Sequence, residues 1–186
     1  MRLFVAFGVA DDVVDRLDRE LAPLRDRHPG LNWTPPATWH VTLAFLGEVD
    51  GERIDEVEAA VSGAVAAAGQ GVGSIELTLA EPGRFGDRVA WLGVEDRPRG
   101  AVARLGAAIQ DDIAARPGLP VDRKAIRPHV TLARARGRRG RLPPELGEDL
   151  PRLDASWTVP VATIFRSHLG AGPLEHEPLV TVPLAG

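Results

Sequence analysis

The sequence predicts an α+β fold built mainly on antiparallel sheet. Two observations indicate this class. Short apolar runs rich in β-branched residues, typical of strands, occur along the whole chain, and three segments with the apolar spacing of amphipathic helices lie among them. The strands and helices do not alternate strictly, as a parallel βαβ sheet would require. We therefore expect strands with antiparallel neighbours and helices that cover the sheet.

The first third of the chain contains the same strand–helix unit twice. Residues 2–9 are an apolar run that predicts a strand, and Asp11 or Asp12 is placed to cap a helix directly after it. The apolar residues of this helix recur at three- and four-residue steps: Val13, Val14, Leu17, Leu21 and Leu24. A second strand is expected over residues 40–49. The helix after it has one apolar face, formed by Ile54, Val57, Val61 and Val65.

The rest of the chain predicts a hairpin, one more helix and three more strands. Residues 74–80 and 88–95 are two strand-like runs, and a loop is expected to join them over residues 81–87. The helix, which should end at Arg116-Pro117-Gly118, has one apolar face formed by Val102, Leu105, Ile109 and Ile113. The remaining expected elements are strands over 127–136, 157–169 and 176–184 and an exposed loop over 137–151.

Composition limits the class of protein. At 186 residues the chain is expected to form one compact, monomeric domain over residues 1–186. It has no cysteine, which excludes a disulfide framework and a thiolate metal site and fits a reducing cytoplasm. No apolar run approaches the roughly 20 residues that cross a bilayer. Because the start also lacks a basic flank and a cleavage site, we expect a cytoplasmic protein without membrane contact.

Charge is distributed unevenly along the chain. The net charge of -4, from 22 basic and 26 acidic residues, argues against a general nucleic-acid coat protein. Eight of the basic residues nevertheless lie within residues 123–141, which contain no acidic residue. All of the basic residues except Lys124 are arginine, whose planar fork suits phosphate recognition. A GC-rich genome would explain the excess of arginine but not its clustering.

The most informative feature is a pentapeptide, His-Val-Thr-Leu-Ala, that occurs at residues 40–44 and again at 129–133. Both copies lie in strand-like runs, where successive side chains point to opposite faces. His40 and Thr42 should therefore share one face of their strand, and His129 and Thr131 one face of theirs. The alternate residues are expected to point into a core: Val41, Leu43, Val130 and Leu132.

Two such strands facing each other would place two imidazoles and two hydroxyls around one small site. The ordinary pKa of imidazole, about 6.5, lets one histidine accept a proton while the other donates one. Threonine hydroxyls can donate hydrogen bonds to phosphate oxygens whose charge grows during a reaction. The pattern predicts a phosphodiesterase with His40 and His129 as acid and base and with Thr42 and Thr131 as phosphate ligands.

Other interpretations of the two histidines are weaker. A single strand histidine is most often a core or surface residue, but two matched copies reverse that expectation. Two histidines 89 residues apart, without an obvious carboxylate partner, fall short of the three or four ligands that zinc takes. The chain has no Gly-x-Ser-x-Gly elbow, and its glycine-rich residues 69–73 lack the Lys-Ser/Thr ending of a phosphate-binding loop. We expect no metal and no other cofactor.

At these residues the sequence resembles the two-histidine (2H) phosphoesterase superfamily, in particular its RNA 2',3'-cyclic phosphodiesterase branch, first described as 2'-5' RNA ligases. The likeness extends in order through RLFVAFGV, WHVTLAFLGEV, GRFG with RVAWLGVE, RPHVTLARAR and FRSHLGAGPLEHEPL. It implies a bilobal fold: two lobes related by a pseudo-twofold, each with a mainly antiparallel sheet flanked by helices, bring one motif each to a central cleft.

The same likeness implies the chemistry. His40 would be the general acid toward the 3' oxygen and His129 would activate water, so that a 2',3'-cyclic phosphate at the end of an RNA or nucleotide becomes a 2'-phosphate. Reversible 2'-5' RNA ligation would be a second activity. Two alternatives stay open: the same chemistry on another cyclic or 2'-5' phosphoester, and a non-catalytic protein that binds RNA ends through residues 123–141.

Further site residues are implied by the resemblance. Arg134 would contact the phosphate or the adjoining ribose, and Arg127 would lie at the rim of the cleft. Phe85 and Trp39 would stack on a base. Each also has a plainer interpretation, as a solvated strand arginine or a core aromatic. The other histidines are expected at a helix end and at surface or structural positions: His28, His168 and His176.

The sequence also departs from this family in two places. Ile126 stands where an aromatic residue often precedes Arg-Pro-His, and the chain contains no tyrosine. Both changes concern base stacking rather than phosphate chemistry, so the sequence leaves the base preference open.

Overall fold

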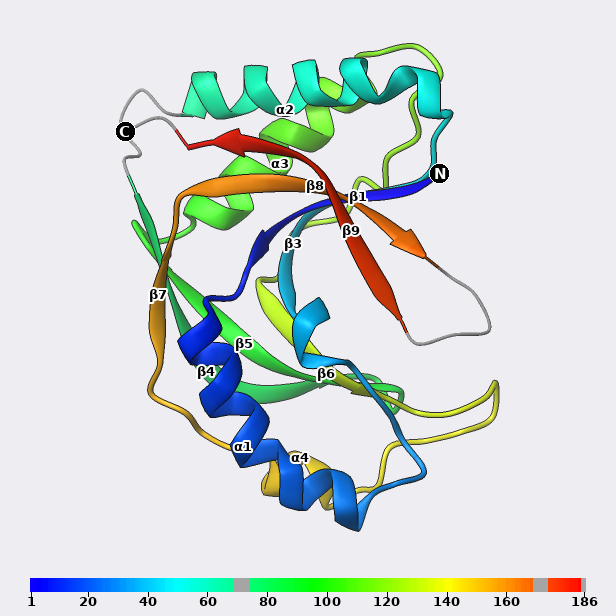
Figure 1. Cartoon of the computed structure of the whole chain (residues 1–186), viewed down its shortest axis with the longest axis vertical. Coiled ribbons are helices and arrows are strands. Elements are labelled where there is room, and N and C mark those ends of the chain that lie inside the picture. The colour runs from blue at the N-terminus through cyan, green and yellow to red at the C-terminus, as the bar shows by residue number, and fades with distance from the viewer. Residues whose placement is uncertain (69–73, 169–173, 185–186) are drawn as a thin grey trace.

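The computed structural model, which describes residues 1–68, 74–168 and 174–184, contains two antiparallel sheets (Figure 1). The four-stranded sheet has the order β3-β1-β8-β9 and is formed by β1 (Arg2–Gly8), β3 (His40–Glu48), β8 (Val161–His168) and β9 (Glu175–Pro183). The five-stranded sheet has the order β2-β6-β5-β4-β7. Its strands are β2 (Asn32–Trp33), β4 (Ile75–Phe85), β5 (Val89–Arg97), β6 (His129–Arg134) and β7 (Ser156–Val159). The expected α+β class with antiparallel pairing is confirmed.

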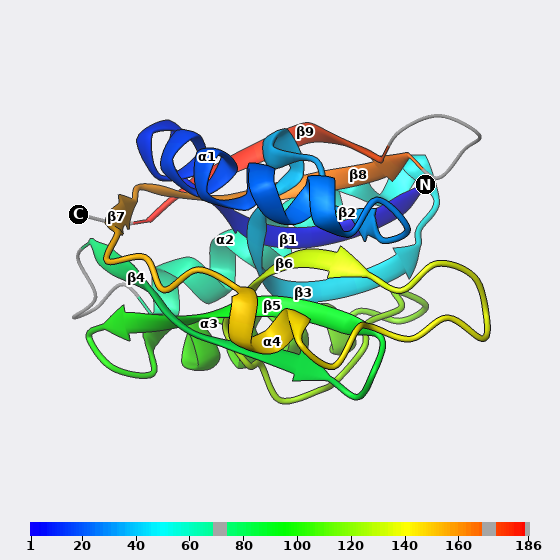
Figure 2. The same ribbon diagram turned by 90° about the horizontal axis from the view of Figure 1, so that it is seen from below.

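Helices flank both sheets and connect them. They are α1 (Asp11–Arg27), α2 (Ile54–Ala68), α3 (Ala101–Ala114) and the short α4 (Leu146–Asp149), with 3-10 turns at Pro36–Thr38 and Gly51–Arg53. α2 and α3 pack on each other and on β9 and β3, whereas α1 lies over the five-stranded sheet (Figures 1 and 2). α1 follows β1 of the four-stranded sheet but covers the five-stranded sheet. α3 follows β5 of the five-stranded sheet but covers the four-stranded sheet. Across the described ranges, none of the helices combines the length and apolarity that a bilayer crossing requires.

Several expected boundaries are wrong. Asp11 and Asp12 do not cap α1, because Ala10 is its N-cap and makes no side-chain hydrogen bond; the two carboxylates lie in the first turn, where they favour the helix dipole. β4 continues to Phe85, past an irregularity between Leu79 and Pro82, so most of the expected loop over 81–87 is strand. The glycine-rich residues 69–73, and residues 169–173 of FRSHLGAGPLEHEPL, lie outside the described residues.

The structure differs from the expected elements in two further segments, residues 137–151 and 157–169. The expected exposed loop over 137–151 contains α4, and three of its leucines are buried: Leu142, Leu146 and Leu150. The expected strand over 157–169 is divided at Pro160, which has no N–H to donate to a sheet. β7 joins the five-stranded sheet before this residue, and β8 joins the four-stranded sheet after it.

Gly83 tests how tightly the five-stranded sheet is packed. It lies opposite Trp91 in the β4–β5 pair, and a Cβ atom added to it would overlap the indole ring. We expect Gly83→Ala to lower the free energy of unfolding by about 2 kcal/mol, as overpacking does. Denaturant unfolding measures the change, with Gly8→Ala as the control because a Cβ atom there meets nothing within 4 Å. Equal midpoints for the two variants would show that Trp91 moves aside without cost.

Candidate active site

β3 and β6 bring the two copies of the pentapeptide to one cavity of about 360 Å³, which His40, Thr42, His129 and Thr131 line together. The alternate residues of both copies are fully buried on the other side of each strand: Val41, Leu43, Val130 and Leu132. The expected alternation of faces is confirmed for both strands. Two imidazoles and two hydroxyls therefore surround one space, although 89 residues separate the histidines in the chain.

Both histidines are held in the same way. Nδ1 of His40 lies 2.7 Å from the carbonyl oxygen of Thr38, and Nδ1 of His129 lies 2.7 Å from the carbonyl oxygen of Arg127. A carbonyl oxygen only accepts hydrogen bonds, so Nδ1 carries the hydrogen in each ring. Nε2 is then the nitrogen of each imidazole that gains or loses a proton, and it is the one left for a ligand.

Burial favours the neutral form of both imidazoles. It lowers the pKa of His40 from its ordinary value near 6.5 to about 4, against the opposing effect of the Thr38 carbonyl. Repulsion from Arg134, and from His176 and His129 when these are protonated, lowers it further. The pKa of His129 is also lowered, again mainly by burial. A phosphate anion in the cavity would attract protons and act in the opposite direction.

His176, expected at a surface or structural position, is a third imidazole that lines the cavity. Its ring centroid lies 5.2 Å from that of His40, nearly edge-on, and each of the two rings lies 4.8 Å from Phe4. β9 pairs with β8 so that His176 is opposite Ser167, another residue of the cavity wall. Its place beside His40 also depends on the pairing of β8 with β1 and of β1 with β3, so no local pattern in the sequence indicates it.

The other side of the cavity has an aromatic cluster around His129. The ring of Phe85 is 38% exposed and meets the imidazole edge-on, with a centroid distance of 4.8 Å. Trp91 lies 6.0 Å away, and the guanidinium carbon of Arg127 lies 4.5 Å from the Trp91 ring centroid. Phe85 is thus partly exposed beside His129, and Arg127 is exposed next to the cluster. Their roles in binding stay predictions.

Of the two remaining residues expected at the site, Arg134 and Trp39, only the first lines the cavity. Arg134 lines the cavity, and burial lowers its pKa. Trp39 does not: it is only 5% exposed and packs in the core, so the expectation that it stacks on a base is wrong. The turn at Pro36–Thr38 directs this indole inward as it places the Thr38 carbonyl at His40. Sequence reasoning did not indicate the other wall residues: Arg2, Phe4, Thr34, Phe45, Ser167, Leu174 and His176.

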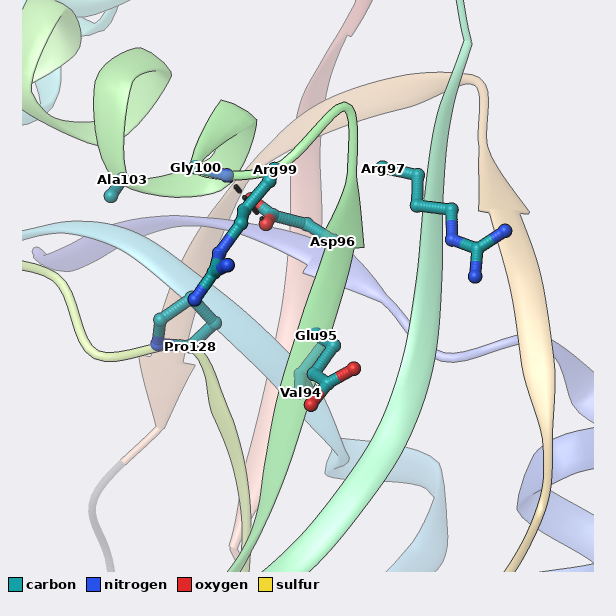
Figure 3. Close-up of a pocket in the computed structure, with 8 residues that line it drawn as sticks. All are labelled: Val94, Glu95, Asp96, Arg97, Arg99, Gly100, Ala103 and Pro128. Atoms are coloured by element: carbon teal, nitrogen blue, oxygen red, sulfur yellow. Dashed lines mark hydrogen bonds between the residues drawn. The ribbon is translucent and has the colours of Figure 1, made fainter.

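A second cavity, of about 510 Å³, lies beside the start of α3 and does not include either motif (Figure 3). Two carboxylates line it, Glu95 and Asp96. Asp96 accepts hydrogen bonds of 2.7 Å from the backbone N–H groups of Gly100 and Val102, and these hydrogen bonds cap α3. The described part of the chain also has no cluster of three His, Asp or Glu side chains arranged to hold a metal ion.

The geometry agrees with comparisons to known proteins. A model of the 2'-5' RNA ligase superfamily matches residues 10–171. The chain belongs to this superfamily. The resemblance expected from the two motifs is thus confirmed.

Two relatives are named RNA 2',3'-cyclic phosphodiesterase. One, from Geobacillus stearothermophilus, is 27% identical over 98% of this chain and 57% of its own length. The other, from Escherichia coli, is 31% identical over 75% of this chain and 72% of its own length. The chain therefore spans little more than half the length of the Geobacillus relative.

A solved structure has the same architecture as this member of the superfamily. TT0787 of Thermus thermophilus superposes with a TM-score of 0.77 at 25% identity, covering all of this chain and 99% of its own. The expected two-lobed fold, with antiparallel sheets flanked by helices, is confirmed.

Proposed function

We propose that this protein hydrolyses the 2',3'-cyclic phosphate at the end of an RNA to a 2'-phosphate, with His40 and His129 as acid and base. One observation carries the proposal: two imidazoles with Nε2 available, and two threonine hydroxyls, line a single cavity. The names of the relatives from Geobacillus stearothermophilus and Escherichia coli support the same substrate.

The reaction needs one proton taken and one proton given. Water attacks phosphorus while Nε2 of neutral His129 accepts its proton, and the new P–O bond forms. The bond from phosphorus to the 3' oxygen breaks, and Nε2–H of protonated His40 donates a proton to that leaving oxygen. Thr42, Thr131 and Arg134 hold the non-bridging oxygens, whose charge grows as phosphorus becomes five-coordinate. The anionic substrate supplies the charge that raises the pKa of the acid.

Product identity tests the reaction directly. In excess chelator, cytidine 2',3'-cyclic phosphate should be converted to cytidine 2'-phosphate without detectable 3'-phosphate, because in the proposed mechanism the acid protonates the 3' oxygen. Phosphorus NMR or chromatography separates the two isomers. Accumulation of the 3'-phosphate would reverse the assignment of the leaving oxygen, and activity that is lost with chelator and restored by a metal would contradict the metal-free mechanism.

The two threonines should act on the rate through charge stabilisation. Thr131→Val keeps the shape of the side chain and removes the hydroxyl, and we expect kcat to fall roughly tenfold, as the loss of one hydrogen bond to a charged group implies. Thr42→Val should have a similar effect. The matched control is Thr78→Val, because the Thr78 hydroxyl bonds Ser156 between β4 and β7 and does not line the cavity. A threonine variant with the kcat of the control would show that the hydroxyl does not touch the phosphate.

The alternatives make different predictions for the same protein. Hydrolysis of another ester would appear as a higher kcat/KM on a 2'-5' oligonucleotide than on any 2',3'-cyclic nucleotide. A protein that only binds RNA ends would show salt-dependent binding and no product from any of these esters. The two matched imidazoles favour hydrolysis, since binding requires positive charge but no acid–base pair.

A further inference from the structure

The loop after β6, residues 135–142, is a built structure, which we call the basic loop. Figure 1 shows it extending beyond the end of β6. The guanidinium of Arg88, next to the β4–β5 turn, donates hydrogen bonds of 2.6, 3.0 and 2.6 Å to three carbonyl oxygens of the loop: Gly137, Arg138 and Gly140. Backbone hydrogen bonds fasten both of its ends to the same turn, from Ala135 to Arg88 and from Leu142 to Asp87.

This anchoring has a consequence for the side chains of the basic loop. The guanidinium of the half-buried Arg88 binds the loop carbonyl groups, so the backbone is held while the side chains of Arg138 and Arg139 remain exposed. At Gly140 an added Cβ atom would overlap the carbonyl of Arg136, so the tight path of the chain requires glycine there. A merely solvated basic turn would need neither feature. The loop therefore presents its charges from a fixed backbone.

The eight basic residues of 123–141 divide into engaged and free groups. Three form ion pairs within the described residues, as Arg123–Asp111, Lys124–Asp122 and Arg141–Asp87. Arg136 donates to the side-chain oxygen of Asn32, and Arg127 packs on Trp91. The three that form no ion pair, no side-chain hydrogen bond and no cation–π contact in the described part of the chain are Arg134, Arg138 and Arg139. Arg134 lines the cavity, and the other two lie four and five residues further along the chain, on the basic loop.

We propose that Arg138 and Arg139 bind the phosphodiester backbone of the RNA whose 3' end occupies the cavity, so that the preferred substrate is an oligonucleotide. This inference rests on the proposed function. A cavity of about 360 Å³ is at the small end of ligand sites and holds little more than the terminal nucleotide, so the rest of a strand lies outside it. From Arg134, four residues of extended chain reach at most about 14 Å, so the free arginines lie within reach of the nucleotides next to the end. Bidentate arginine contacts then hold phosphates of any sequence.

The test compares two substrates in excess chelator: cytidine 2',3'-cyclic phosphate and an RNA decamer with the same cyclic end. For the protein as it stands, kcat/KM should be at least tenfold higher for the decamer, and this advantage should shrink as salt increases. In Arg138→Gln/Arg139→Gln, KM for the decamer should rise roughly tenfold with kcat unchanged, and the mononucleotide should be unaffected. The salt dependence of log KM should lose about 0.7 per phosphate contact removed.

The matched control is Arg123→Gln/Lys124→Gln, which removes the same charge from the same segment at residues already paired with Asp111 and Asp122. It should retain the decamer KM within about twofold, as long-range attraction alone is screened at physiological salt. Equal kcat/KM for the two substrates, or equal effects of the two double variants, would overturn the role of the basic loop. A parallel rise of KM for the mononucleotide would overturn it as well, by placing these arginines in the cavity itself.

Loss of the proposed function would be distinguishable from loss of this inference. If neither substrate were hydrolysed, the proposed function would fail. Fluorescence anisotropy with a labelled decamer ending in a 2'-phosphate would still decide the role of the basic loop, through the Kd of the protein and of both double variants. A Kd raised only by the Arg138 and Arg139 substitutions supports the inference, and a Kd unchanged by them contradicts it.

Discussion

Replacing either cavity histidine by alanine is expected to lower kcat on a 2',3'-cyclic nucleotide by roughly 10²- to 10⁴-fold, the usual contribution of a positioned acid or base. KM should change little, because the proposed phosphate ligands Thr42, Thr131 and Arg134 still line the cavity. The neutral imidazoles make few other contacts through Nε2, so His40→Ala and His129→Ala should fold normally. Steady-state kinetics in excess chelator, with circular dichroism as a check on folding, measures the effect.

The losses in kcat caused by the two substitutions should not be multiplicative in the double variant. Acid and base act in the same step, so the double variant should be about as slow as the slower single variant rather than slower by the product of the two losses. The control is His168→Gln, because His168 pairs with Glu177 on the surface at 2.8 Å and does not line the cavity. A His40→Ala or His129→Ala variant with the kcat of His168→Gln would exclude that histidine from the reaction.

The geometry of the two motifs was predictable because it depends on local rules. Period-two alternation assigns His40 and Thr42 to one face of β3 and Val41 and Leu43 to the other, whatever the strand pairs with. The repeat then applies the same rule to β6. Helix faces follow in the same way from a period of 3.6, which is why Val57 and Val61 are buried as expected. Such features need no knowledge of distant contacts.

The parts of the site that escaped sequence reasoning depend on long-range pairing. His176 reaches His40 only because β9 pairs with β8, which pairs with β1, which pairs with β3. Phe4 lies in a strand buried on both faces, where a continuous apolar run has no period to indicate which side meets the cavity. Trp39 precedes a motif in sequence, yet the 3-10 turn before it sends its side chain into the core.

The lowered pKa of His40 predicts how stability depends on pH. In the unfolded chain this histidine takes up a proton near pH 6.5, whereas in the folded protein it stays neutral to about pH 4. The unfolded state therefore binds more protons between these values, and the free energy of unfolding falls as pH is lowered through this window. At about 1.4 kcal/mol per pH unit, the loss from His40 alone is about 3 kcal/mol by pH 4. The lowered pKa values of His129 and His176 act in the same direction.

Urea unfolding of the protein and of His40→Gln between pH 7 and pH 4 isolates this contribution, because carboxylate titration is common to both. As pH falls, the free energy of unfolding of the unsubstituted protein should drop by about 3 kcal/mol more than that of the variant. Inorganic phosphate should reduce the shift, since an anion in the cavity stabilises the protonated imidazole that the empty cavity disfavours. Parallel stability curves would show that water reaches His40 freely. A shift that phosphate does not reduce would mean that the buried imidazole has no access to an anion, and so cannot act as the acid.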